Sequence, residues 1–263
     1  MKENIAISEN NSLKRLLDEA VVRYNVPNFI ENDPLSIPHR FTILQDIEIT
    51  AFWTSMLAWG QRKTIINKAN DLFERMDNAP HDFIVNHSEI ERKRFETFVH
   101  RTFQPTDALY FLAFFQDFYQ KNTSLETAFA AHLRPDDTTI EAALVGFNKQ
   151  FFGLEYVPDR TRKHVASPTS GSSCKRLCMF LRWMVRRDAQ GVDFGLWRNI
   201  SPSQLIMPLD VHVERQARAL GLLERPKTDW KAALELTERM RAFDPEDPVK
   251  YDFALFGAGV SSE

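Results

Sequence analysis

The spacing of the apolar residues is the feature that most constrains what this chain can fold into. Segment after segment repeats apolar side chains at intervals of three and four residues, which gives an α-helix one buried face. No segment shows the apolar–polar alternation of a half-buried strand, and no internal repeat is visible. With 43% hydrophobic residues among 263, the chain can bury a sizeable core. We therefore expect an all-α bundle, forming one large domain or two intimate subdomains.

Residues typical of helix termini indicate where several of these helices begin and end. A serine or threonine followed three residues later by glutamate marks helix starts at Ser88, Thr123 and Thr138. Three prolines between Asn25 and Arg40 indicate a connector instead of a helix. Periodicity and flanking residues predict further helices over residues 12–25, from Asp46 onwards with an interruption at Gly60, from 107 to 121, from 228 to 243, and from Pro248 to the end.

The stretch SGSSCKRLCMFLRWMVRR, residues 170–187, combines a turn with an amphipathic helix. Glycine adopts any backbone angle, and serine hydroxyls accept hydrogen bonds from the first N–H groups of a helix. These amides and the positive end of the helix dipole favour a bound phosphate. The predicted phosphate-binding turn consists of Ser170, Gly171, Ser172 and Ser173. The buried stripe of the helix consists of Cys174, Leu177, Cys178, Leu181, Met184 and Val185.

Lys175 lies in the first turn of this helix. Met179, Arg182 and Arg186 share its largely basic face, so the lysine has cationic neighbours and is expected at the margin of the core. Both influences lower the pKa of a lysine towards neutrality, as an amine nucleophile requires. The alternative is a solvated charge on a helix flank.

A second stretch, PLDVHVERQARALGLL, starts a helix with a carboxylate, Asp210. Aspartate at this position is typical of an N-cap, whose side chain accepts hydrogen bonds from the first turn. Capping uses one carboxylate oxygen and leaves the other free for chemistry. A lysine and a carboxylate, each fixed at a helix start, could therefore face one cleft.

Charge is distributed unevenly along the chain. The formal net charge is −3, but residues 158–187 carry eight bases and one acid, a net +7 that leaves −10 on the remainder. A local basic stripe on an acidic protein suits a polyanion and disfavours binding over the whole surface. The alternative is a charged surface without a partner.

The N-terminal residues lack the apolar core of a signal peptide, and no run approaches the 18 apolar residues of a membrane span. We expect a cytoplasmic protein with no membrane contact. The only two cysteines, Cys174 and Cys178, match neither a zinc pattern nor a redox pair and are interpreted as small core residues. An iron–sulfur cluster needs four such ligands, so we expect neither a cluster nor another cofactor or metal.

The Asp210 stretch resembles the segment that carries the catalytic aspartate in the helix-hairpin-helix DNA glycosylases, the endonuclease III superfamily. Lys175 takes the place of the hairpin lysine that attacks the sugar in the bifunctional members. The chain departs from the family where its Leu-Pro-Gly-Val-Gly hairpin is replaced by residues 166–174, and the spacing of 35 residues between lysine and aspartate is nearer that of the archaeal 8-oxoguanine branch. The closing segment DPVKYDFALFGAG is similar to that branch as well, and the whole chain looks like a poorly characterised bacterial family on this plan. The residues that match are Pro208, Asp210, His212, Val213 and Arg215, together with Gln61 and the Asn67-Lys68-Ala69 run.

The resemblance implies a helical barrel over residues 46–187 and a second subdomain made of 1–45 and 188–263, without an iron–sulfur cluster. It implies a glycosylase with abasic-site lyase activity on double-stranded DNA, in which Lys175 forms a Schiff base with the sugar of a damaged nucleotide, an oxidised purine for example. Asp210 would take the amine proton, and Gln61 would fill the space that the flipped nucleotide leaves. The residues expected to contact DNA are Gln61, Arg62, Lys63, Arg162, Lys163, Ser170, Gly171, Ser172, Ser173, Arg176, Arg182, His212 and Arg215.

Two alternatives stay open at this point. A DNA- or RNA-binding protein could keep the scaffold without the reaction, because a fold alone does not confer activity. A helical scaffold with no nucleic-acid role is the other. The lesion is not specified either, because aromatic residues such as Trp53, Trp59, Phe147 and Trp197 are interpreted as core residues more readily than as pocket walls.

Overall fold

The computed structural model describes residues 2–261 and the side chains of residues 10–259. Within this range the chain is helical and forms no strand, and the only pairing of β type is an isolated bridge between His100 and Phe103. The all-α class is therefore confirmed. None of these helices is long and apolar enough to cross a membrane. The α-helices are α1 (Lys2–Tyr24), α2 (Leu44–Leu57), α3 (Arg62–Glu74), α4 (Pro80–Asn86), α5 (Glu89–Arg92), α6 (Pro105–Tyr119), α7 (Glu126–Ala130), α8 (Glu141–Phe151), α9 (Lys175–Val185), α10 (Val211–Ala219), α11 (Trp230–Arg241) and α12 (Tyr251–Ser261).

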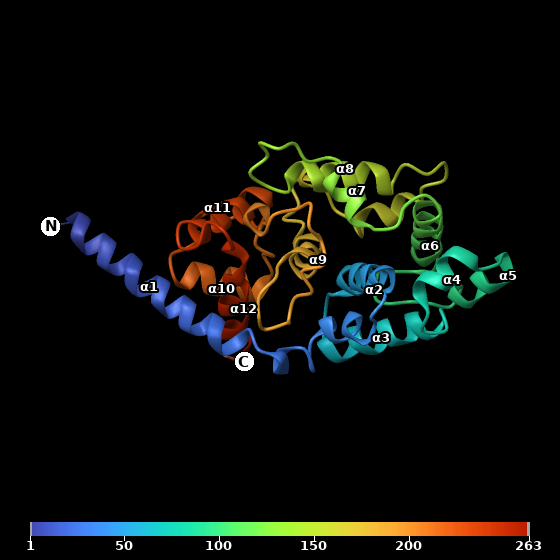
Figure 1. Ribbon diagram of the computed structural model, residues 1–263, viewed down its shortest axis with the longest axis horizontal. Coiled ribbons are helices and arrows are strands. Elements are labelled where there is room, and N and C mark those ends of the chain that lie inside the picture. The colour runs from blue at the N-terminus through green and yellow to red at the C-terminus, as the bar shows by residue number, and fades with distance from the viewer. Residues whose placement is uncertain (1, 262–263) are drawn as a thin grey trace.

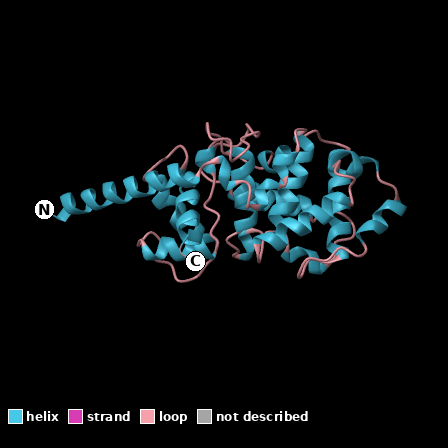
Figure 2. Ribbon diagram, turned by 90° about the horizontal axis from the view of Figure 1, so that it is seen from below, coloured by secondary structure: helices cyan, strands magenta, loops and turns pink. Residues whose placement is uncertain are grey.

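The helices form two groups with α9 between them (Figure 1). The first group contains α2 to α6, and the second contains α10, α11, α12 and the end of α1. Figure 2 shows that the beginning of α1 projects away from the other helices. Helix α9 packs on α2, whereas α12 packs on both α1 and α10. One continuous hydrophobic cluster runs through both groups, and the subdomain boundaries at Asp46 and Arg187 stay a prediction.

Helix α2 is the central element of the first group. Every residue from Asp46 to Leu57 is buried. Phe52 packs against five other phenylalanine rings, with centroid distances of 5.3 to 6.0 Å. Edge-to-face contacts of this kind add to the burial of apolar area. Many of the 21 phenylalanines therefore fill the space around this one helix.

The connector and one of the three predicted helix starts agree with the sequence prediction, and the other two starts do not. Residues 27–40 form three short 3-10 helices, each begun by a proline. The capping box at Ser88 is present. The predicted starts at Thr123 and Thr138 were wrong, because α7 begins at Glu126 and α8 at Glu141. The Glu126 carboxylate accepts hydrogen bonds from residues 198 and 199 and does not turn back to its own helix.

A buried carboxylate joins α2 to three segments that are distant in sequence. Glu48 is fully buried, and each of its two oxygens accepts two hydrogen bonds. Tyr119 and the Leu125 amide donate to Oε2 at 3.0 and 2.9 Å, and Ser124 and the Trp197 indole donate to Oε1 at 2.5 and 2.8 Å. Burial raises the pKa of Glu48, while the four donors lower it. These four contacts link α2 to α6, to the α6–α7 connection and to the chain after α9.

Replacing Glu48 by glutamine should destabilise the protein. Whichever way the amide is oriented, its NH2 group faces two donors that then lack an acceptor, at a cost of about 2 kcal/mol or more. The measurement is the free energy of unfolding in urea. Glu74→Gln, at an exposed position in α3, is the matched control and should change stability by less than about 0.5 kcal/mol. Equal stabilities for the two variants would contradict this role for Glu48.

Candidate active site

Lys175 and Asp210 line the same cavity. The cavity has a volume of about 70 Å³ and lies where the starts of α9 and α10 meet α12 and the end of α2. The two side chains that the sequence singled out for chemistry are therefore brought together by the fold. The complete lining is Phe29, Asp33, Ala58, Lys175, Arg176, Met179, Arg182, Trp183, Pro208, Asp210, Asp252 and Phe256.

Lys175 is the first residue of α9, and the turn before it is tighter than predicted. Pro168–Ser170 is a 3-10 helix, Gly171 is left-handed with φ of 75°, and Cys174 is also left-handed with φ of 51°. A non-glycine residue rarely adopts this conformation, and such strain concentrates at functional sites. It turns the chain sharply into α9 immediately before the lysine.

The serines of this turn do not cap α9, which corrects our expectation. The Ser172 hydroxyl accepts a hydrogen bond from the amide of Cys174, the residue before the helix, and the Ser170 hydroxyl donates to the Ser167 carbonyl. No side chain caps the first turn of α9. Lys175 is half-buried, and in the described part of the chain its amine has no hydrogen-bond or ion-pair partner. The start of α9 thus presents uncapped amides and an unpaired amine.

Asp210 is the N-cap of α10, which confirms the sequence interpretation. Its Oδ1 accepts hydrogen bonds from the amides of His212 and Val213, both at 2.9 Å. Its Oδ2 has no partner among the described residues. Because capping fixes the side chain, the second oxygen is held in one position at the cavity.

A second acid, Asp252 of α12, lies in the same cavity and was not singled out from the sequence. It is 5% exposed and forms an ion pair with Arg182. Phe256, one helical turn later on α12, is also part of the lining. The only sequence signal was a lone charge four residues before an aromatic residue in an otherwise apolar helix. Asp33, a further buried acid of the lining, comes from the proline-rich connector.

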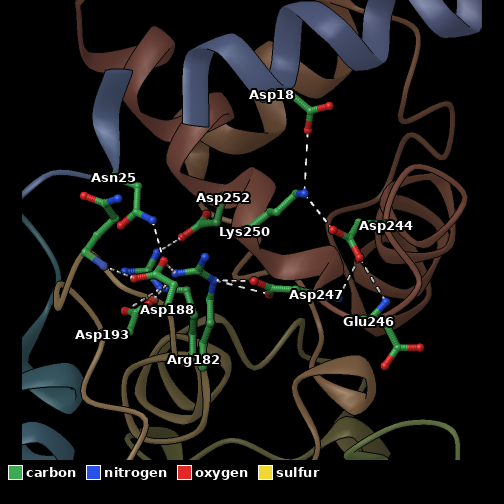
Figure 3. A network of polar contacts seen from close by, with 12 residues as sticks. Asp18, Asn25, Arg182, Asp188, Asp193, Asp244, Glu246, Asp247, Lys250 and Asp252 are labelled. Carbon is green, nitrogen blue, oxygen red and sulfur yellow. Dashed lines mark hydrogen bonds and ion pairs between the residues drawn. The ribbon is translucent and has the colours of Figure 1, made fainter. Parts of the chain in front are cut away.

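Arg182 and Arg186, which the sequence placed on a largely basic face of α9, are both buried. Figure 3 shows Arg182 close to Asp193 and Asp252. Arg182 contacts Asp193 and Asp252 and is 4% exposed. Arg186 contacts Asp193 at 3.1 Å and two further aspartates, Asp188 and Asp247, at 2.7 and 2.9 Å. A buried guanidinium must be paired, so these contacts satisfy both charges inside the fold. Arg182 was predicted to bind DNA, and its burial excludes it from a surface contact.

Burial and neighbouring carboxylates raise the pKa of Asp252 to about 7. Asp210 and Asp193 repel its negative charge, and together with burial they outweigh the attraction of Arg182. Burial also raises the pKa of Asp33. The cavity therefore contains a carboxyl group that can exchange a proton near neutral pH, which suits general acid–base chemistry.

Three other residues predicted to contact DNA are engaged within the fold. Arg176 donates to the carbonyls of Met56 and Lys163, at 2.6 and 3.3 Å, and burial lowers its pKa to about 10. Arg215 donates to the Gly259 carbonyl at 2.7 Å. His212 packs edge-on against the Phe256 ring at 5.8 Å. All three position the helices around the cavity, and Arg176 also lines it.

The remaining predicted contacts are more accessible. Arg62, the first residue of α3, lies 5.0 Å from the centre of the Phe256 ring and so joins α3 to the cavity wall. Gln61, Lys63, Arg162 and Lys163 are exposed. Gln61 precedes α3 without capping it, next to Gly60, whose φ of 104° leaves room for Arg101 where a side chain would otherwise be. Whether these residues touch DNA stays a prediction.

The interpretation of the cysteines and of most candidate aromatic residues as core is confirmed. Cys174 and Cys178 are buried, and burial raises the pKa of Cys174 to about 12. Trp53, Phe147 and Trp197 are buried as well. Trp59 is half-buried and lies between His100, His164 and the Arg176 guanidinium.

The fold and cavity define an all-α protein with an amine and carboxylates in one small cavity. The chain belongs to the DUF2400 family, which is described as a protein of unknown function and whose model matches residues 33–261. No curated protein and no solved structure gives a significant match to the chain.

The raised pKa of Asp252 should make stability depend on pH. A carboxyl whose pKa is higher in the folded state stabilises the fold at low pH, and this contribution is lost as the pH rises through about 7. Wild type should therefore lose about 2 kcal/mol relative to Asp252→Asn between pH 5 and pH 8. Urea unfolding at the two pH values measures this difference.

Asp188→Asn is the matched control, because Asp188 belongs to the same network but its pKa is lowered by its hydrogen bonds and by Arg186. Because its pKa is lowered from the ordinary value of an aspartate, Asp188 is ionised at both pH values, and its difference from wild type should be the same at pH 5 and pH 8. Parallel pH profiles for wild type and Asp252→Asn would show that Asp252 does not titrate in this range.

Proposed function

We propose that this protein is a DNA repair glycosylase with abasic-site lyase activity, built on the helix-hairpin-helix scaffold. The observation that supports the proposal is the cavity shared by Lys175 and Asp210. An unpaired amine and a fixed carboxylate oxygen that line one cavity are the two groups needed for an amine nucleophile and its proton acceptor. The substrate proposed is double-stranded DNA with a damaged base, such as an oxidised purine.

The reaction would follow from the groups in the cavity. Asp210 Oδ2 takes a proton from the Lys175 ammonium, and the free amine attacks C1′ of the deoxyribose as the bond to the base breaks. The departing base takes up a proton, for which the protonated form of Asp252 is one source. The covalent intermediate rearranges to a Schiff base, which allows elimination of the 3′ phosphate. The negative charge of Asp210 also offsets positive charge that develops on the sugar.

The surroundings of the cavity suit a phosphate backbone. The uncapped amides of the first turn of α9 and the exposed Lys63, Arg162 and Lys163 would hold phosphates near the lesion. Gln61 would occupy the space left by the flipped nucleotide. These contacts fix the register of the protein on the duplex and do not read its sequence.

The small size of the cavity bears on how a nucleotide would enter. At about 70 Å³ it is far below the roughly 300–1,000 Å³ of typical ligand pockets. Phe29 and Phe256 both line it and pack edge-on at 6.1 Å. We expect these two rings to separate when a nucleotide enters. The closed state favours the second candidate, a DNA- or RNA-binding protein that has kept the scaffold without the reaction.

Reductive trapping separates the two candidates. Wild type should release a base from one member of a panel of lesion-bearing duplexes, and borohydride should link it covalently to that duplex or to abasic DNA. Lys175→Gln should abolish trapping, and Asp210→Asn should slow base release by at least about 100-fold, the lower range for loss of a positioned proton acceptor.

Lys163→Gln is the matched control, because it removes an exposed lysine outside the cavity lining. It should weaken duplex binding modestly and leave the yield of the trapped adduct at saturating DNA unchanged. If wild type binds these duplexes but forms no adduct with any of them, the non-catalytic alternative holds.

A further inference from the structure

Three arginines that the reaction does not use line one groove at the other end of α9. The groove has a volume of about 530 Å³ and lies between the end of α7, the chain just after α9 and residues 198–204. Its charged lining residues are Arg134, Arg187 and Arg198, and no acid is among its lining residues. Helix α9 spans about 15 Å from Lys175 to Val185. The groove is therefore a separate site and not an extension of the cavity.

The three guanidinium groups are free to bind an anion. Arg134, Arg187 and Arg198 are exposed, and within the described chain none of their side chains has a hydrogen-bond or ion-pair partner. The two other arginines near the end of α9 differ, because Arg182 and Arg186 are paired with aspartates. Unpaired guanidinium groups on one concave surface raise the local concentration of anions.

The groove is held in shape by hydrogen bonds. Buried Glu126 accepts from the amides of Arg198 and Asn199 at 2.6 and 2.5 Å and from the Asn199 side chain at 3.0 Å. Gln204 donates to the Asp137 carbonyl at 2.8 Å, which joins the two walls. The glutamate carboxylate is thus used by the backbone beneath the arginines. An anion would meet guanidinium groups in a fixed frame, which reduces the ordering cost of binding.

Arg187 is fixed by a close approach of the backbone. Gly195 has φ of 55°, and a side chain there would lie 2.4 Å from the Arg187 Cβ. Glycine at this position therefore lets the chain fold back against Arg187. Arg187 belongs to the basic stripe of residues 158–187 that the sequence indicated, and the cavity does not use it.

We propose that this groove binds the phosphodiester backbone of a single-stranded nucleic acid. Guanidinium forks match phosphate oxygens in pairs, and neutral hydrogen-bonding groups from Asn199, Ser201 and Gln204 lie beside them. The apolar members of the lining are largely withdrawn, since Ile200 is fully buried and Leu133 half-buried. The surface therefore suits the regularly spaced negative charges of a phosphodiester backbone better than the apolar side chains of a peptide. The adjoining hollow contains Asp136, Asp137 and Glu238 and would turn the strand away at that end.

Fluorescence anisotropy with a labelled 12-nucleotide oligothymidine tests the proposal. Arg187→Gln combined with Arg198→Gln should weaken binding about tenfold at low salt. It should also reduce the slope of log K against log salt by about 1.4, since each of the two lost phosphate contacts on a single strand contributes about 0.7. The double variant should retain the wild-type melting temperature and the wild-type yield of adduct on abasic duplex. A loss of affinity with unchanged trapping would therefore place the single-strand site apart from the cavity.

The matched control replaces two exposed arginines elsewhere, Arg15→Gln with Arg239→Gln, and changes the net charge equally. It should bind the oligonucleotide as wild type does. Three results would overturn the proposal: no binding by wild type, equal weakening by the control, or displacement of the oligonucleotide by a polyglutamate peptide of the same charge at the same concentration.

Discussion

The ion pair between Arg182 and Asp252 is the interaction on which the arrangement of the cavity depends. Arg182 lies two helical turns after Lys175 on the same side of α9, and Asp252 lies in the first turn of α12. Arg182 is buried and charged, so it needs an acceptor on α12, and the Asp252 carboxyl can accept from it in either protonation state. The pairing sets which side of α9 faces α12, and so directs Lys175 towards the cavity. Asp210 reaches the same cavity because α10 packs on α12.

The same network contributes to the raised pKa of Asp252 in the cavity. Arg182 and Arg186 are shared among Asp188, Asp193, Asp247 and Asp252, so acids outnumber the two arginines. Burial raises the pKa of Asp252 to about 7, and repulsion from Asp210 and from Asp193 of this network adds to the effect. The Asp252 carboxyl can therefore exchange a proton near neutral pH, at a position fixed by its contact with Arg182.

Sequence reasoning succeeded where the information is local. Helical periodicity gave the all-α class, and the position of Asp210 before an apolar-periodic run gave its N-cap. It failed where a side chain's burial or hydrogen-bond partner depends on a residue distant in the sequence. A basic face on α9 looks the same whether water or an aspartate 70 residues later meets it, so the burial of Arg182 was not predicted. The pattern at Thr123 and Glu126 satisfies a capping box, but Asn199 takes the carboxylate. Asp252 and Asp33 were not predicted as site residues, because only the folded structure brings α12 and the connector to the cavity.

We propose that one cavity, fixed by the contact between α9 and α12, holds the amine and the carboxylate that act on a nucleotide. A crystal structure with a duplex that contains a stable abasic-site analogue is the direct test. We expect the sugar of the analogue in the cavity, within hydrogen-bonding distance of Lys175 Nζ and Asp210 Oδ2, with the contact between Arg182 and Asp252 intact. A duplex bound across another surface, with the cavity empty and closed by Phe29 and Phe256, would contradict it.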